Sequence, residues 1–217
     1  MLFETERQTV VELCQQLSQR GFFAATGGNL MLRLDARQVA VTPSATDYAS
    51  LSAADVCVLN LSDLSVVEAQ RSPSVESSLH ARVLRRRADL QCSIHTHQPL
   101  ASACALLGAP LDVPAEQQPL LGKRVPVVGY APSGTTLLAR RLERAVDAHS
   151  HAWLMRNHGV LCAAADSDTA LAAIEALERL AAAHLNRLIG QRLERMPPAK
   201  RDALAVLQND LQQEAAL

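Results

Sequence analysis

Residues 92–97 have the sequence Cys-Ser-Ile-His-Thr-His, in which two histidines end an apolar run. This pattern predicts a β-strand. Side chains two positions apart on a strand point to the same face, so His95 and His97 stand side by side as a chelating pair requires. Two polar residues at the end of a strand give the same pattern, so both interpretations stay open on this stretch alone.

A third histidine interrupts another apolar run. Strand-like residues 152–155 are followed by Arg-Asn-His-Gly at 156–159, and the apolar pattern resumes over 160–164. A polar break of this kind costs burial unless it lines a site, and Gly159 is expected to permit a backbone conformation that larger residues resist. Three neutral imidazoles around zinc leave one position open, which is the arrangement of catalytic zinc sites.

Glu76 is the candidate acid/base. It ends the sequence Arg-Ser-Pro-Ser-Val-Glu at 71–76 and falls in the first turn of a helix predicted over 75–87, with Ser74 as its N-cap. One interpretation is a carboxylate stabilised by the helix dipole or by capping. The other is a carboxylate beside a metal, which ligates at rest and moves off to take a proton.

The remaining elements follow from apolar periodicity and turn signals. We expect helices over 4–20, 99–107, 134–148 and 168–189, strands over 29–34, 38–42, 56–61 and 125–128, and a helical tail after residue 198. Strands and helices mix without strict alternation, which indicates an α/β sandwich with a mainly antiparallel or mixed sheet. The length of 217 residues fits one domain over 1–217.

Composition narrows the class of protein. A net charge of −1 argues against binding of nucleic acid or an anionic membrane. The five scattered cysteines indicate buried thiols in a reducing compartment. The charged N-terminus does not read as a signal peptide, and no apolar window is long enough to span a bilayer. We therefore expect a soluble, cytoplasmic protein.

Five short motifs, taken in order, resemble the class II aldolase/adducin family. They are Thr-Gly-Gly-Asn at 26–29, Val-Thr-Pro-Ser at 41–44, Pro-Ser-Val-Glu at 73–76, His-Thr-His at 95–97 and Arg-Asn-His-Gly at 156–159. The resemblance implies a three-layer α/β/α sandwich around a mostly antiparallel sheet. It also implies a homotetramer with active sites at subunit interfaces.

The resemblance to the sugar-phosphate aldolases of this family also implies a chemistry. Zinc, or another divalent metal, would be held by His95, His97 and His158. Glu76 would be the acid/base and a metal ligand before substrate binds. The expected reaction is aldol cleavage of a small ketose phosphate or related hydroxy-ketone through a metal-stabilised enediolate. The residues expected to bind phosphate or substrate are Thr26, Gly28, Asn29, Ser44 and Ser74.

The chain departs from this pattern in the phosphate loops and in the second acid/base. Ala45 and Val75 stand where many relatives have glycine and serine, and both changes reduce the capacity to bind an anion. Only two tyrosines, Tyr48 and Tyr130, are present. Glu116 lies roughly where methylthioribulose-phosphate dehydratases carry a second catalytic glutamate. It is expected either to act in catalysis or to be an exposed loop carboxylate.

Several functions therefore remain as alternatives to the aldolase. A dehydratase, an epimerase or a decarboxylase of the same family would share the metal site and differ in the second acid/base. An adducin-like binding module is disfavoured because all three histidines and Glu76 are present. A zinc hydrolase is disfavoured because the chain has no His-Glu-x-x-His motif.

Overall fold

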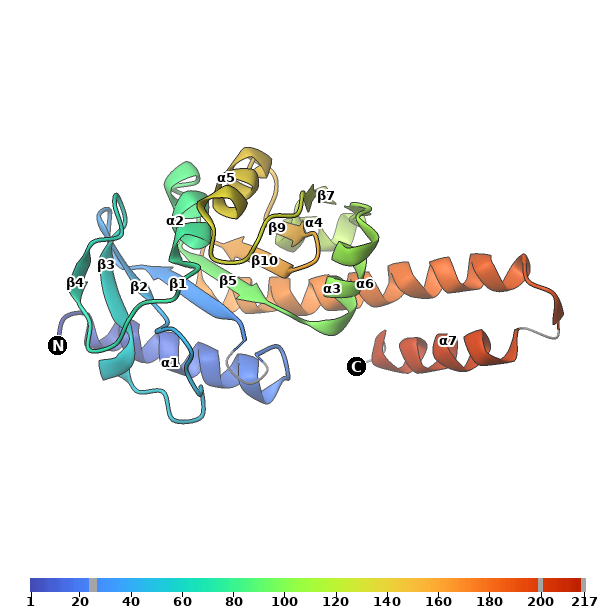
Figure 1. Ribbon diagram of the computed structural model, residues 1–217, viewed down its shortest axis with the longest axis horizontal. Helices are drawn as coiled ribbons and strands as arrows, with labels where there is room; N and C mark the ends of the chain where they lie inside the picture. Colours follow the sequence, from blue (N-terminus) through green and yellow to red (C-terminus); the bar gives the residue numbers. More distant parts are fainter. Residues whose placement is uncertain (24–26, 199–200, 216–217) are drawn as a thin grey trace.

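A central sheet of eight strands, covered by helices on both faces, forms the body of the computed structural model (Figure 1), which describes residues 1–23, 27–198 and 201–215. The strand order is β4-β3-β2-β1-β5-β10-β9-β8, and every neighbouring pair is antiparallel except β8 and β9. The strands are β1 (Asn29–Arg33), β2 (Gln38–Val41), β3 (Cys57–Asn60), β4 (Val66–Glu68), β5 (Cys92–Thr96), β8 (Val127–Val128), β9 (Ala152–Met155) and β10 (Gly159–Ala164). A separate pair joins β6 (Leu111–Asp112) to β7 (Arg124–Val125). The mostly antiparallel sheet is thus confirmed.

Two helical layers enclose this sheet and complete the expected sandwich. One layer contains α1 (Glu4–Gln19), α3 (Pro99–Leu107), α4 (Gln118–Leu121) and α6 (Ser167–Glu194). The other contains α2 (Ser77–Arg86) and α5 (Thr136–Ala145). Alternate residues of each strand feed the two cores: Ile94 and Val160 pack toward α1 and α6, and Leu161 packs toward α2 and α5. The three-layer α/β/α architecture is confirmed.

The same alternation places the polar residues of the central strands. Because Ile94 points toward α6, its neighbours Ser93 and His95 point toward α2. Asn29 on β1 pairs directly with His95 on β5. The α2 face of the sheet therefore carries a polar cluster at the end of β1 and β5.

The helix predicted over 75–87 begins two residues later than expected. It starts at Ser77, and Glu76 takes the N-cap position without a capping bond from its side chain. The prediction of Ser74 as N-cap is wrong. An isolated bridge between Pro43 and Pro73 keeps the chain extended there, and the Ser74 hydroxyl accepts from the Glu76 backbone N–H at 3.2 Å.

Smaller differences have local causes. The strand predicted over 125–128 is divided into β7 and β8 at Pro126, which has no N–H to give to a ladder. Within the stretch expected to be irregular lie β6, the short 3₁₀ helix η2 (Ala115–Gln117) and α4; a second such helix, η1 (Ala53–Asp55), precedes β3. Strand β4 was not expected from the sequence.

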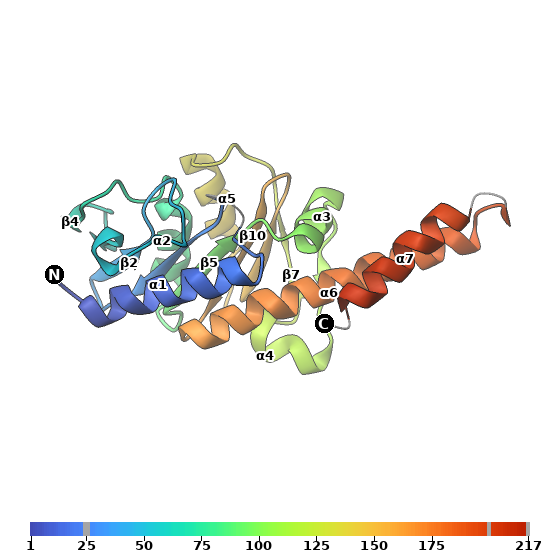
Figure 2. The same ribbon diagram turned by 90° about the horizontal axis from the view of Figure 1, so that it is seen from below.

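The C-terminal part forms a helical hairpin. Helix α6 continues past the body, and α7 (Asp202–Ala215) returns beside its distal half (Figures 1 and 2). Across the described ranges, none of the helices combines the length and apolar composition of a membrane span.

Candidate metal centre

Three histidines from two parts of the sheet converge on one point. His95 is on β5, His97 follows directly after that strand, and His158 is in the turn between β9 and β10. One ring nitrogen from each lies within 4.8 Å of the others. The centroids of the His95 and His97 rings are 4.7 Å apart, and the Nε2 atoms of His95 and His158 are 3.0 Å apart. The structure thus brings together the three residues that the sequence singled out.

The turn that delivers His158 depends on its two neighbours in different ways. Asn157 has a φ of 53°, in the left-handed region that asparagine tolerates better than most residues. Gly159 does not have a positive φ, so the expected conformational reason for this glycine is wrong. A Cβ at Gly159 would lie 2.4 Å from the Thr96 carbonyl oxygen and 2.6 Å from the His97 ring. Glycine is needed there because the two strands approach closely.

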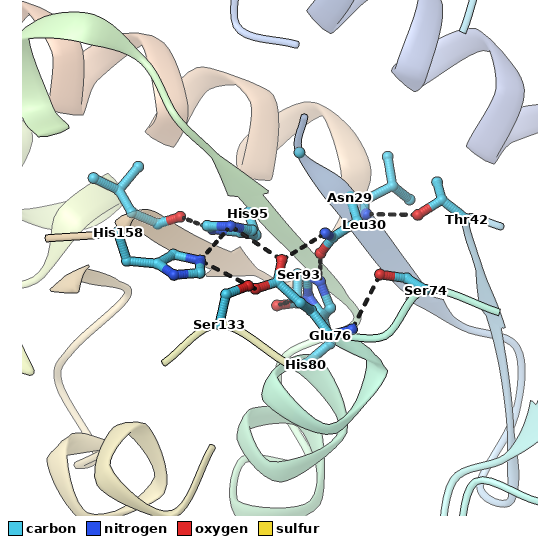
Figure 3. A network of polar contacts seen from close by, with 12 residues as sticks. Asn29, Leu30, Thr42, Ser74, Glu76, His80, Ser93, His95, Ser133 and His158 are labelled. Carbon is cyan, nitrogen blue, oxygen red and sulfur yellow. Dashed lines mark hydrogen bonds and ion pairs between the residues drawn. The ribbon is translucent and has the colours of Figure 1, made fainter. Parts of the chain in front are cut away.

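Glu76 reaches this cluster from the start of α2 (Figure 3). Its Oε2 atom lies 3.3 Å from His95 Nε2, and its Oε1 atom lies 3.1 Å from His158 Nε2. The carboxylate also accepts from Asn29 Nδ2 at 2.9 Å and from Ser133 Oγ at 2.7 Å. Burial by itself would raise the pKa of Glu76, but these hydrogen bonds and the histidines hold it well below its usual range.

The protonation of these groups fits a divalent metal. His95 Nδ1 lies 2.7 Å from the Val160 carbonyl oxygen, which can only accept, so Nδ1 carries the proton and Nε2 presents its lone pair. Burial lowers the pKa of His95 to about 3, which keeps the ring neutral near pH 7. Several acceptors therefore lie close together: the Nε2 lone pair of His95 and the two Glu76 oxygens, with His158 Nε2 beside them. There are too few hydrogen atoms among them for every close pair to form a hydrogen bond. Such a set suits a divalent cation, and the Val160 carbonyl orients its first ligand.

Of the residues expected to bind phosphate, Gly28 and Asn29 lie at the start of β1, Ser44 follows β2 and Ser74 precedes α2, while Thr26 lies outside the described residues. Gly28 has a φ of 89°, and a Cβ there would lie 2.3 Å from the Phe23 ring. The Asn29 side chain is bonded to Glu76, as described above. The backbone N–H groups of Ser44 and Ser74 already donate to the Ser72 and Thr42 carbonyls, at 2.9 and 3.0 Å.

The loop after Ser44 keeps a backbone shape that favours glycine. Ala45 has a φ of 49°. An alanine in the left-handed region costs about 1–2 kcal/mol relative to the right-handed one. Buried Thr46 supports the turn by donating to the Pro43 and Ser44 carbonyls, both at 3.3 Å. The departure from glycine at this position therefore leaves the left-handed turn in place.

Glu116, the predicted second acid/base, lies away from the cluster. Glu116 is exposed on η2, and its neighbour Ala115 lines a cavity with His149 and His151, which precede β9. His158 follows the other end of β9, so one chain does not bring Glu116 to the histidines. Tyr48 is buried and donates to the Gly28 carbonyl oxygen at 2.5 Å.

Ser133 was not predicted from the sequence. His80 lies four residues after Glu76, so the sequence predicts that it shares that helix face and either packs there or supports the site. Ser133 lies in the loop between β8 and α5, and the same loop carries Tyr130, which is 51% exposed. The signal that could have identified this loop is its position after β8, since β8 runs parallel to β9 and both therefore end near His158. His80 is buried behind Glu76 and bonded to Asn29.

An α/β/α sandwich with a three-histidine, one-carboxylate cluster at the ends of its central strands defines a class of divalent-metal protein. The sequence profile described as Class II Aldolase and Adducin N-terminal domain matches residues 8–185. The chain therefore belongs to the class II aldolase and adducin family.

Named relatives agree with this assignment. A 5-deoxy-D-ribulose 1-phosphate aldolase from Bacillus thuringiensis serovar kurstaki is 32% identical over 180 residues, which cover 82% of this chain and 83% of that protein. A methylthioribulose-1-phosphate dehydratase from Pectobacterium carotovorum subsp. carotovorum is 30% identical over 200 residues, covering 84% and 96%.

A solved structure of an L-fuculose 1-phosphate aldolase superposes with a TM-score of 0.76 at 28% identity, covering 92% of this chain and 93% of that one. The relatives are lyases or dehydratases, which is consistent with a metal-dependent lyase, and the enzymatic class expected from the sequence is confirmed.

Proposed function

We propose that this protein is a divalent-metal-dependent aldolase that cleaves a small ketose 1-phosphate. The observation that carries the proposal is the convergence of His95, His97 and His158 with the Glu76 carboxylate. The substrate class comes from the relatives, two of which are named as aldolases of deoxyribulose and fuculose 1-phosphates.

His95, His97 and His158 would hold the metal, with Glu76 as a further ligand at rest; zinc is our proposal for the ion. When bound, the metal supplies a Lewis acid beside the substrate carbonyl, which stabilises the negative charge that develops there. The Val160 carbonyl keeps His95 in the tautomer that ligates.

Cleavage breaks the bond between C3 and C4 of the ketose. The C4 hydroxyl loses its proton as it becomes an aldehyde, and the electron pair of the broken bond stays with the three-carbon fragment. The Glu76 carboxylate receives the hydroxyl proton and then gives it to C3, which completes dihydroxyacetone phosphate. Glu76 is suited to this because its carboxylate already lies among the ligands, within reach of a substrate bound there. Tyr130, exposed in the Ser133 loop, is our candidate for the group that passes the hydroxyl proton on to Glu76.

The phosphate would act as a remote handle that positions the reacting carbons. We propose that Thr26, Gly28, Asn29, Ser44 and Ser74 form this subsite. Two of their backbone N–H groups are occupied within the chain, so side-chain hydroxyls would supply most of the donors.

A dehydratase is the second candidate, because a relative of 30% identity carries that name. It would require a second acid/base, for which Glu116 is the sequence-based candidate. Since Glu116 does not meet Glu76 within one chain, that role would require a second copy of the chain to supply it. An epimerase or decarboxylase of the same metal site would be recognised by its product.

The test is a product assay on purified, zinc-loaded protein. L-Fuculose 1-phosphate and 5-deoxy-D-ribulose 1-phosphate are offered, and dihydroxyacetone phosphate is measured with a coupled dehydrogenase. We expect release from at least one of them. If neither is cleaved while methylthioribulose 1-phosphate loses water, the dehydratase replaces the aldolase. Unchanged turnover in Glu116→Gln would then remove Glu116 from that mechanism.

The homotetramer with active sites at subunit interfaces is part of the same proposal, as is the cytoplasmic location. His97 is exposed in the single chain, and the metal cluster is thus open to a neighbouring subunit or to substrate. Size-exclusion chromatography with light scattering tests the assembly.

A further inference from the structure

A chain of buried hydrogen bonds runs from the sheet to the back of Glu76 (Figure 3). Ser93 Oγ lies 2.8 Å from His80 Nδ1, and His80 Nε2 lies 2.6 Å from Asn29 Oδ1. Asn29 Nδ2 in turn donates to Glu76 Oε2 at 2.9 Å. Ser93 and His80 are fully buried and Asn29 is 6% exposed, so water does not compete for these bonds.

The direction of every bond in this chain is set by the carboxylate. Glu76 is ionised and only accepts, so Asn29 must present its NH₂ group to it. The Asn29 carbonyl oxygen then faces His80 and requires a donor, which makes Nε2 the protonated nitrogen of that ring. His80 Nδ1 is left to accept from the Ser93 hydroxyl. Burial lowers the pKa of His80 to about 4, which agrees with a neutral ring.

The orientation of the Asn29 amide is therefore tied to His80. If the amide turned over, its oxygen would face the Glu76 carboxylate at hydrogen-bond distance, and two acceptors would repel each other. The His80 N–H, by binding the amide oxygen, favours the one orientation that supports Glu76. Ser133 holds the other oxygen from the solvent side.

We propose that His80 is a positioning residue, which acts through Asn29 to hold the Glu76 carboxylate against His95 and His158. The assignment extends the proposed function, because it gives that site a buried support. A histidine that only filled space in the core would need neither a particular tautomer nor a particular partner.

The first test is the protonation of His80 in the metal-free full-length chain. Long-range ¹H–¹⁵N NMR spectra of ¹⁵N-histidine-labelled protein distinguish the two tautomers, and His80→Gln assigns the signal. We expect the Nε2–H tautomer. The Nδ1–H tautomer, or a charged ring at pH 7, would overturn the proposal.

The second test is zinc affinity, measured by competition with a chromophoric chelator. Replacing a residue that orients a metal ligand lowers metal affinity about 10- to 100-fold. We expect that loss in His80→Leu and substantial recovery in His80→Gln, which keeps a side-chain N–H donor. Leu84→Ala is the matched control: Leu84 is buried on the same helix. It should lower stability while leaving zinc affinity within threefold of wild type.

A double-mutant cycle decides whether His80 acts through Asn29. In an Asn29→Ala background, His80→Leu should cost little further zinc affinity, because the intermediate residue is already gone. If the two substitutions lowered zinc affinity by independent factors, or if His80→Leu alone had wild-type zinc affinity, the proposal that His80 acts through Asn29 would be overturned. All these measurements omit sugar phosphates, so a protein with the expected tautomer and zinc affinities but no cleavage activity would refute the proposed function and leave the relay standing.

Discussion

At the scale of single residues, Gly159 shows how closely the histidine cluster and the backbone are packed together. We expect Gly159→Ala to lower the free energy of unfolding by about 1–3 kcal/mol, as overpacked cores do. The added methyl group would press on the Thr96 carbonyl and the His97 ring, so zinc affinity should also fall at least tenfold. Urea unfolding and chelator competition measure the two effects.

Gly190→Ala is the control for that substitution. Gly190 lies within α6, and among the described residues a Cβ there meets only the flexible Gln208 side chain, at 3.2 Å. Alanine should stabilise the helix slightly or have no effect, and zinc binding should be unchanged. Wild-type zinc affinity in Gly159→Ala would contradict the close-approach explanation.

Glu76 carries the proton chemistry in the proposed mechanism. Glu76→Gln keeps the shape of the side chain and removes its ability to exchange a proton, so turnover should fall about 10²- to 10⁴-fold. The measurement is release of dihydroxyacetone phosphate at saturating ketose 1-phosphate with zinc supplied. Glu143→Gln is the control: Glu143 is a half-buried carboxylate of α5 that pairs with Arg82 and not with the histidines, and the variant should retain wild-type turnover. A Glu76→Gln enzyme within threefold of wild type would exclude Glu76 as the acid/base.

At the scale of elements, α2 is attached to the sheet partly by a neutral buried histidine. The pKa of His80 is lowered to about 4 in the folded chain, whereas an unfolded chain has the ordinary value near 6.5. Between these values the unfolded state binds a proton that the folded state excludes. The contribution of neutral His80 to the free energy of unfolding is therefore fully present above pH 6.5. It falls by on the order of 3 kcal/mol as the pH falls toward 4.

The comparison of wild type with His80→Gln isolates this term. Other buried histidines titrate in both proteins, so their effect cancels. The free energy of unfolding of wild type, minus that of His80→Gln, should fall as the pH is lowered from 6.5 to 4. Denaturant unfolding of the metal-free proteins at several pH values measures it, and a difference that does not depend on pH would contradict the neutral His80.

Elements with long apolar patterns could be predicted from the sequence, and those set by tertiary contacts could not. The patterns of α1, α3, β5 and β10 fixed their positions to within a residue or two. The start of α2 was misplaced because local propensity favours Ser74 as a cap, whereas the bridge at Pro73 and the bonds of Glu76 to the histidines override it. Pro126, which lacks a backbone N–H, was a sequence signal that the strand predicted over 125–128 is interrupted.

The candidate site was predictable only where its residues lie in recognisable motifs. The three histidines and Glu76 each belong to a short motif. Ser133 does not, and its contact with Glu76 depends on β8 pairing in parallel with β9, a long-range arrangement that no local pattern encodes. Glu116 was identified by its position relative to the second glutamate of the family's dehydratases. In the structure it lies on η2, whose residue Ala115 lines a cavity with His149 and His151, away from the histidine cluster.

At the scale of the whole molecule, the body and the C-terminal hairpin differ in how they are held. Both core clusters are built from residues of the sheet and of α1 to α6, and neither includes a described residue of α7. We therefore expect deletion of residues 197–217 to change the melting temperature by less than about 4 °C. Calorimetry measures this. A fall of more than about 10 °C would show that α7 belongs to the cooperative unit, as one domain over 1–217 predicts.

The most direct measurement is the metal content of the protein. Purified wild-type chain, dialysed against zinc and then against buffer, is analysed by inductively coupled plasma mass spectrometry beside His95→Ala and the surface control His149→Ala. We predict about one zinc ion per chain in wild type and in His149→Ala, and less than a tenth of that in His95→Ala. Equal zinc in all three proteins, or no zinc in wild type, would contradict the assignment of this cluster as a metal centre.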